Sequence, residues 1–260
     1  RRSLPVPVFA LWPFALLLAT GLVAEALGVA PHWATRPLVV AGFHGGLLAG
    51  ALAAAWGGAR GWGGPATLLT GFLLGAGVSY QLSPWGSLAY LVPPLIVAGL
   101  GWRHAHLRRL SWDRPEDLRA LLLGALIGLF LGAHLLFSAS RTFGYPVRLT
   151  PAAPLLAAFA YDVGANVLSA ELFIRGTLFN AWLRRWGFSA GATCATGVFV
   201  LRYLADPSLP RTLEVTAGAV FYLALLSVAG CALTARSGSL LPSAVASLCF
   251  FGAYRALQLW

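Results

Sequence analysis

SAELFIRG, residues 169–176, places a carboxylate and a guanidinium inside a long apolar segment. Glu171 and Arg175 stand four residues apart, so on an α-helix their side chains meet on one face and can neutralise each other. Either group alone would be expensive to place in hydrocarbon. The spacing therefore predicts a buried helix that carries either a structural ion pair or part of a functional site.

The composition of the whole chain is that of a membrane protein. Of the 260 residues, 58% are hydrophobic and 10% are charged, whereas about a quarter of a soluble domain is charged. All 18 basic residues are arginines, and the net charge is +10. Most of these arginines lie between apolar runs, where the positive charge of cytoplasmic loops accounts for them, so we expect no nucleic-acid partner. The predicted fold class is all-α, a polytopic bundle of transmembrane helices.

Apolar runs along the chain are long enough to cross, or nearly cross, a hydrocarbon core of about 30 Å. They predict about eight to nine spans, at residues 8–29, 38–56, 66–81, 87–102, 118–137, 153–182, 188–204, 214–234 and 239–259. The third and fourth runs are short and could be tilted, re-entrant or one broken unit. We assign the first five runs to an N-terminal group, residues 1–150, and the others to a four-helix core, residues 151–260.

The arginines also favour one orientation of these spans. A cytoplasmic N-terminus places the larger share of them on the cytoplasmic side: Arg1, Arg2, Arg60, Arg103, Arg108, Arg109, Arg114, Arg119, Arg184, Arg185 and Arg236. The first apolar run has no small-residue cleavage site before a polar region, so we expect it to stay as a membrane helix. The sequence thus predicts a multi-pass protein of a bacterial inner membrane.

Two runs carry small residues at a spacing of four, which puts them on one helix face. The second run has Gly42, Gly46, Gly50 and Ala54, and the fifth has Gly124, Gly128 and Gly132. Small residues in this pattern let a neighbouring helix approach closely and gain dispersion contacts. Tight helix packing at both faces is the prediction.

Acidic side chains inside apolar runs are rare enough to be functional candidates. Here they are Glu25, Asp162 and Glu171. Asp162 and Asn166 share a helix face and could form a polar lining or an interhelical hydrogen bond, of which we favour the bond. A water-accessible path lined by Glu25, Asp162 and Asn166 would instead indicate a transporter.

Two histidines, His44 and His134, also lie in apolar runs, with glycines close by in the sequence. A neutral buried histidine can bond a backbone carbonyl or ligate a metal or porphyrin, so both are candidate cofactor-binding residues. No cofactor is required by the sequence, although a pigment or a lipid could be bound. The three cysteines, Cys194, Cys231 and Cys249, form no C-x-x-C pair and predict no metal site.

Three motifs in the last hundred residues follow one another at a telling spacing. They are AELFIRG at 170–176, FVLRY at 199–203, and GSLLP at 238–242 leading to SLCFF at 247–251. This series resembles the CPBP family of intramembrane glutamic peptidases, also called the CAAX-protease and bacteriocin-processing or Abi family. That family carries E-E-x-x-x-R-G, then F-x-x-x-H, then H-x-x-x-N or H-x-x-x-D. The resemblance implies a CPBP-like core in the C-terminal half.

The reactive positions of that family are altered here. The family's first glutamate is thought to activate water, its histidines to hold the water or stabilise the oxyanion, and its Asn or Asp to assist. The matching residues are Ala170, Tyr203, Ser247 and Phe251. Alanine cannot accept a proton and phenylalanine offers no donor, while tyrosine and serine hydroxyls are not bases near neutral pH.

The second glutamate and the arginine of the family signature are retained, as Glu171 and Arg175. The resemblance therefore implies a catalytically degenerate relative: a non-catalytic binding, scaffold or accessory subunit of a membrane complex. Its expected partners are membrane lipids and other transmembrane proteins. The alternative is an active intramembrane endopeptidase, similar to a CAAX prenyl protease, that uses Glu171 with Tyr203 and Ser247.

Overall fold

The computed structural model describes residues 11–56, 61–104, 107, 110, 118–144, 149–204 and 213–256. These residues form helices, and no strand occurs among them. The all-α prediction is therefore confirmed for the part of the chain that the structure describes. Arg1, Arg2, Arg60 and most of the arginine-rich segment after Arg103 lie outside the described residues, and the cytoplasmic N-terminus stays a prediction.

Over the residues that the structure describes, each apolar run of the sequence lies mostly in helix. The elements in chain order are α1 (Trp12–Ala26), α2 (His32–Ala55), α3 (Gly63–Leu82), the 3₁₀ helix η2 (Pro84–Leu91), α4 (Val92–Arg103), α5 (Arg119–Phe143), α6 (Ala152–Tyr161), the π-helix η4 (Asp162–Asn166), α7 (Val167–Ala170), the π-helix η5 (Glu171–Phe179), α8 (Asn180–Leu204), α9 (Leu213–Ser237) and α10 (Leu241–Ala256). The third run lies in α3, and the fourth begins as η2 and continues as α4.

A turn inside α8 separates two of the predicted runs. Gly187 has φ 79° and ψ −179°, a backbone conformation that residues with a Cβ rarely adopt. The helix therefore changes direction between the run that ends at Trp182 and the run that begins at Phe188. The boundary expected from the sequence is confirmed at this glycine.

Five stretches of the described residues are long and apolar enough to cross a membrane: His32–Ala55, Pro84–Arg103, Arg119–Thr142, Ala152–Leu204 and Thr216–Ser237. This criterion rests on length and composition. It supports a membrane protein, while the count of eight to nine spans stays a prediction. The stretch Ala152–Leu204 is 53 residues long and contains the turn at Gly187.

The helices group into two compact units that each draw on two parts of the chain. Unit 1 comprises residues 1–110 and 152–173, and unit 2 comprises residues 111–151 and 174–260. The grouping differs from a division of the sequence at residue 150, because α5 packs with α10 whereas α6 packs on η2. One boundary falls inside η5, between Phe173 and Ile174.

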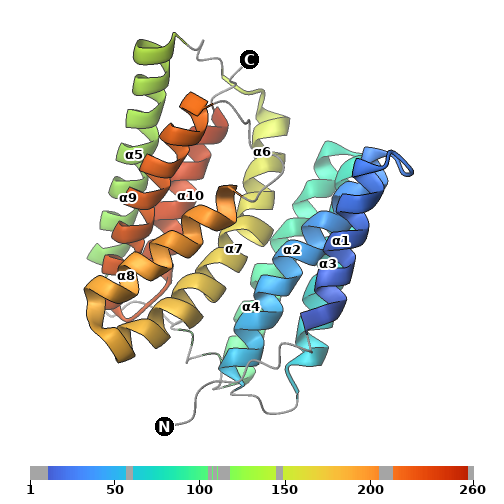
Figure 1. Ribbon diagram of the computed structural model, residues 1–260, viewed down its shortest axis with the longest axis horizontal. Helices are drawn as coiled ribbons and strands as arrows, with labels where there is room; N and C mark the ends of the chain where they lie inside the picture. The colour runs from blue at the N-terminus through green and yellow to red at the C-terminus, as the bar shows by residue number, and fades with distance from the viewer. Residues whose placement is uncertain are drawn as a thin grey trace. The chain divides into compact units, whose positions relative to one another are not determined.

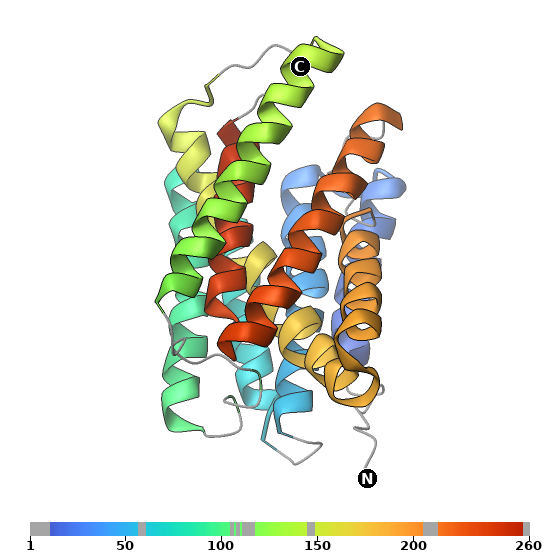
Figure 2. The same cartoon turned by 90° about the vertical axis from the view of Figure 1, so that its left-hand side faces the viewer.

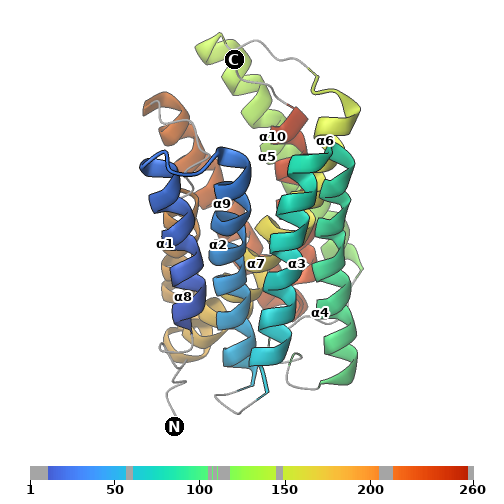
Figure 3. The same ribbon diagram turned by 90° about the vertical axis from the view of Figure 1, so that its right-hand side faces the viewer.

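Unit 1 is organised around α2, which lies beside α1 and α3 (Figure 3). A Cβ added to Gly42 would collide with the backbone of Leu18 in α1, and one added to Gly50 would lie 2.8 Å from the ring of Phe173. The predicted close packing at these glycines is confirmed. Gly164 of η4 lies against the backbone of Tyr90 in η2, so this glycine permits a further close approach.

Unit 2 is organised around the pairing of α5 with α10, which run side by side (Figures 1 and 2). The glycines of α5 face this partner: Gly124 lies against Pro242, Gly128 against Ala246 and Gly132 against Ala253. The small-residue face predicted from the sequence is therefore the α5–α10 interface. The helices α8 and α9 complete the unit, with α9 in contact with α5, α8 and α10.

Replacing Gly128 with alanine should destabilise the protein. The added Cβ would meet the carbonyl oxygen of Ala246, a backbone atom that cannot rotate away, and overpacking of this kind costs about 1–3 kcal/mol. Gly252→Ala in α10 is the matched control, because no atom lies within 4 Å of its added Cβ. Thermal unfolding in detergent should show a lower midpoint for Gly128→Ala than for Gly252→Ala, and equal midpoints would contradict the packing.

Candidate functional site

Glu171 and Arg175 lie on a helix with unusual winding. Residues 152–179 run without a break through α6, η4, α7 and η5, of which η4 and η5 are π-helical. Such π-helical turns are rare and occur frequently at functional sites. Both charged residues belong to η5 and both are 0% exposed. Glu171 belongs to unit 1 and Arg175 to unit 2.

Arg175 sits among α8, α9 and α10 within unit 2. Its guanidinium carbon lies 4.7 Å from the centre of the Phe199 ring in α8, which is within the range of a cation–π contact. Gly230 of α9 and Ser243 of α10 also lie close to this arginine. A Cβ added to Gly230 would lie 2.5 Å from Arg175 Nε and 2.6 Å from Ser243 Oγ. The arginine thus fills space that a larger residue at position 230 would remove.

Two of the altered family positions come together in unit 2. Tyr203 of α8 and Phe251 of α10 stack with ring centres 5.2 Å apart and an angle of 22° between the planes. Each side chain is 5% exposed. Arg202 is also buried, and its guanidinium carbon lies 4.4 Å from the centre of the Tyr203 ring. These positions therefore hold a packed aromatic pair with a cation beside it.

Ser247, a third altered position, is buried on α10. Ser243 and Ser247 are four residues apart, so they lie on one face of α10. Ser239 stands four residues before Ser243, just ahead of the helix. At the start of α10, Leu241 N–H donates to Ser239 Oγ at 3.2 Å. Hydroxyl groups can donate and accept hydrogen bonds, but they supply no general base near neutral pH.

His44 of α2 forms a directional hydrogen-bond chain within unit 1. Ser169 Oγ donates to the carbonyl oxygen of Asn166 at 3.3 Å, so it can accept from His44 Nδ1, which lies 2.9 Å away. His44 Nε2 then accepts from the hydroxyl of Tyr161 at 2.8 Å. This order assigns a neutral imidazole with its proton on Nδ1. Both ring nitrogens are engaged by hydroxyls, so neither is open to a metal or a porphyrin.

The intramembrane acids do not gather at one place. Asn166 Nδ2 donates to Asp162 Oδ1 at 2.8 Å within the same helix, and Asp162 is fully buried. Glu25, near the end of α1, is partly exposed and lies 3.9 Å from His32 Nε2. This bond joins two residues of one helix, and the expected interhelical bond of the pair stays a prediction. Glu25 belongs to a separate, exposed pair, which gives no support to a path lined by all three residues.

His134 of α5 lies in unit 2, where its Nδ1 is 2.6 Å from the hydroxyl of Tyr222 in α9. Unlike His44, the His134 side chain is exposed. Its ring also contacts Phe130, at a centre distance of 6.0 Å. This histidine is therefore the one of the two whose surroundings leave room for a ligand.

No metal centre is formed by the described residues, since no three His, Cys, Asp or Glu side chains gather among them. The chain was also compared with known proteins. No protein family, no curated protein and no solved structure matches it. The resemblance to the CPBP family therefore rests on the motifs quoted above.

Sequence reasoning did not find the partners of the two histidines. Tyr161 and Ser169 are eight residues apart, which is about two helical turns. Tyr161 precedes the Asp162–Asn166 pair and Ser169 follows it. A polar stripe at this spacing is a signal that could have marked them. Tyr222 is one tyrosine in an apolar run, and nothing in the sequence assigns it to His134.

Substitution of Gly230 by alanine should displace the buried arginine. The added Cβ would meet Arg175 and Ser243 at once, so we expect the free energy of unfolding to fall by about 1–3 kcal/mol. Gly218→Ala on the same helix is the control, because its added Cβ meets nothing within 4 Å. Chemical unfolding in detergent measures the free energy of unfolding of both variants. Similar unfolding curves would contradict the close packing at position 230.

Replacing His44 with phenylalanine should remove its hydrogen bonds to Ser169 and Tyr161. The loss of the bond to the Tyr161 hydroxyl should lower the free energy of unfolding by about 0.5–1.5 kcal/mol. A double-mutant cycle with Tyr161→Phe isolates this interaction from the change in ring size. We expect Tyr161→Phe to cost less in the His44→Phe background than alone, and additive effects would refute the bond.

Proposed function

We propose that this chain is a non-catalytic membrane protein built on a degenerate CPBP-like core. It acts as a binding, scaffold or accessory subunit of a membrane complex in a bacterial inner membrane, with its N-terminus in the cytoplasm. Its partners are membrane lipids and other transmembrane proteins.

The observation that carries the proposal is the stack of Tyr203 on Phe251. By resemblance, these positions hold a histidine and an Asn or Asp in a CPBP peptidase. Peptide hydrolysis requires a base for water and donors aimed at the developing oxyanion. This buried pair, with ring centres 5.2 Å apart, supplies no general base, and the Phe251 side chain supplies no donor, so the Tyr203 hydroxyl is the one side-chain donor that these two positions offer.

Other features of the same motifs agree with a non-catalytic role. Ala170 stands where the water-activating glutamate is expected, and it is buried. Loss of one catalytic group typically lowers the rate by about 10² to 10⁴, so the loss of several leaves little activity. Arg175 packs against Phe199, Gly230 and Ser243, as a structural side chain would.

Exposed apolar side chains supply the binding surfaces that the proposal needs. On α5 they include Leu122, Leu126, Phe130 and Phe137, each more than 60% exposed. In a membrane-spanning helix such side chains face lipid tails or the helices of partner proteins. Tryptophan and tyrosine also anchor spans at the membrane interface, so aromatic content alone is no sign of a partner.

The proposal predicts that the purified protein does not cleave peptides. Full-length protein in lipid nanodiscs, given an internally quenched membrane peptide, should show no more cleavage than its Glu171→Gln variant. Cleavage that the Glu171→Gln variant loses while remaining folded would overturn the proposal in favour of an active endopeptidase.

The binding role itself is tested by purification from native membranes in mild detergent. We expect a protein partner or a lipid in stoichiometric amount, identified by mass spectrometry. An unrelated tagged membrane protein, purified in the same way, is the control for adventitious lipid. A monodisperse, solitary chain without any bound molecule would count against the role.

A further inference from the structure

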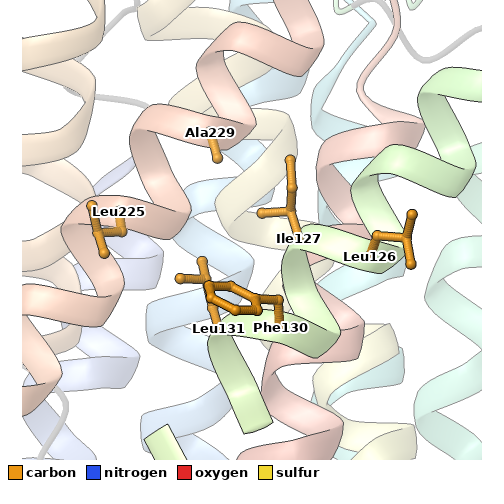
Figure 4. A pocket seen from close by; sticks show the side chains of 6 residues that line it. All are labelled: Leu126, Ile127, Phe130, Leu131, Leu225 and Ala229. Carbon is orange, nitrogen blue, oxygen red and sulfur yellow. The ribbon is translucent and has the colours of Figure 1, made fainter. Parts of the chain in front are cut away.

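The interface of α5 and α9 in unit 2 contains an open groove. It has a volume of about 380 Å³ and is lined by Leu126, Ile127, Phe130 and Leu131 of α5 and by Leu225 and Ala229 of α9 (Figure 4). Small-molecule sites range over roughly 300–1,000 Å³. All of these lining side chains are apolar, so the groove suits a hydrocarbon chain.

A polar pair stands one turn beyond this groove. His134 follows Phe130 by four residues on α5, and Tyr222 precedes Leu225 by three on α9, so both continue the faces that line the groove. The two side chains join across the helices, with 2.6 Å between His134 Nδ1 and the Tyr222 hydroxyl. The groove therefore has an apolar length and one polar end.

His134 lies inside a candidate membrane span, where its polar ring favours a polar ligand. The residue lies about 5 Å along the axis from the middle of the candidate span Arg119–Thr142. It is exposed there, and a polar group that faces lipid at this depth is costly and usually functional. When the Tyr222 hydroxyl donates to Nδ1, the neutral imidazole carries its proton on Nε2, which is then a hydrogen-bond donor.

The chemistry of the ligand follows from depth, charge and shape. Ester carbonyls of ordinary bilayer lipids lie at the interface, roughly 15 Å from the middle of the hydrocarbon core. A ligand head at the depth of His134 must therefore be uncharged, and its partially negative oxygen complements the partially positive Nε2–H. The exposed ring of Phe130 lies beside the ring of His134, with centres 6.0 Å apart and planes inclined at 42°, so the face of Phe130 can pack against a ring of the ligand.

We propose that this groove binds a lipid-soluble quinone. The chain of the quinone lies between α5 and α9, and one of its carbonyl oxygens accepts a hydrogen bond from His134 Nε2. Tyr222 is a positioning residue, because its hydroxyl fixes the tautomer of His134. The inference goes beyond the proposed function: it shares Leu126 and Phe130 with the exposed face of α5 but uses none of the residues in the altered motifs.

A partner helix fits this groove less well than a flexible chain does. Helices in membranes pack closely through small residues, and the glycines of α5 are already in contact with α10. Gly124, Gly128 and Gly132 lie against α10, where an added Cβ at each would collide with that helix. The groove side of α5 presents leucine, isoleucine and phenylalanine, which hold another backbone at a distance but leave space for a chain.

The test uses the full-length protein in lipid nanodiscs with an azido-ubiquinone photoprobe. Labelled peptides are located by mass spectrometry, and unlabelled decylubiquinone is the competitor. We expect saturable labelling within Arg119–Phe143 or Leu213–Ser237. Decylbenzene, which has a ring and a chain but no carbonyl, should compete poorly.

Two substitutions test the two halves of the site. His134→Phe keeps a ring but removes the donor, and we expect the apparent Kd of decylubiquinone to rise about fivefold. Ala229→Phe should fill the groove, so we expect it to abolish the labelling that decylubiquinone displaces. Val228→Phe is its matched control, since Val228 is exposed on α9 and does not line the groove.

The outcomes decide the proposal in either direction. Labelling that decylubiquinone does not displace, that maps to other helices, or that survives both His134→Phe and Ala229→Phe would overturn it. A second overturning result comes from a photoreactive residue placed at position 126, which lines the groove: a cross-link from it to another protein in native membranes would mean that a protein occupies the groove. If His134→Phe fails to fold, the comparison of Ala229→Phe with Val228→Phe decides. A peptidase activity lost in Glu171→Gln would refute the non-catalytic role and leave quinone binding unaffected.

Discussion

The structure depends on one constraint, which is that a polar group inside hydrocarbon needs a polar partner. Each described unit meets it across helices that are distant in sequence. In unit 1, His44 of α2 bonds Tyr161 and Ser169. In unit 2, His134 of α5 bonds Tyr222 of α9. These bonds are directional, so they fix which faces of otherwise similar apolar helices meet, a choice that dispersion alone leaves open.

The two histidines show how one residue type takes different roles through its neighbours. His44 has hydroxyls on both ring nitrogens and a buried position, so it acts as a structural tie between helices. His134 has one nitrogen engaged and an exposed ring at the end of an apolar groove. The stack of Tyr203 and Phe251 also shows an effect of neighbouring side chains, because two rings in contact satisfy each other where polar groups would need hydration.

Hydrophobic runs and turn residues were enough to predict most of the helices. The break at Gly187 and the glycine face of α5 follow from local sequence, because backbone conformation and residue size are properties of the residues themselves. The π-helical turns were not predictable, since a nearly uniform apolar pattern does not distinguish their winding from that of an α-helix. The partners of His44 and the membership of α5 in unit 2 depend on contacts between distant segments, which no local pattern encodes.

The interleaving of the two units has a consequence for biosynthesis. His44 is made 117 residues before Tyr161 and 125 residues before Ser169. During synthesis, α2 therefore enters the membrane with an imidazole whose final partners do not yet exist. Until α6 and α7 follow, water or the insertion machinery must satisfy that ring. The first helices of this chain are thus incomplete until the segment before Glu171, which supplies the partners of His44, has been synthesised.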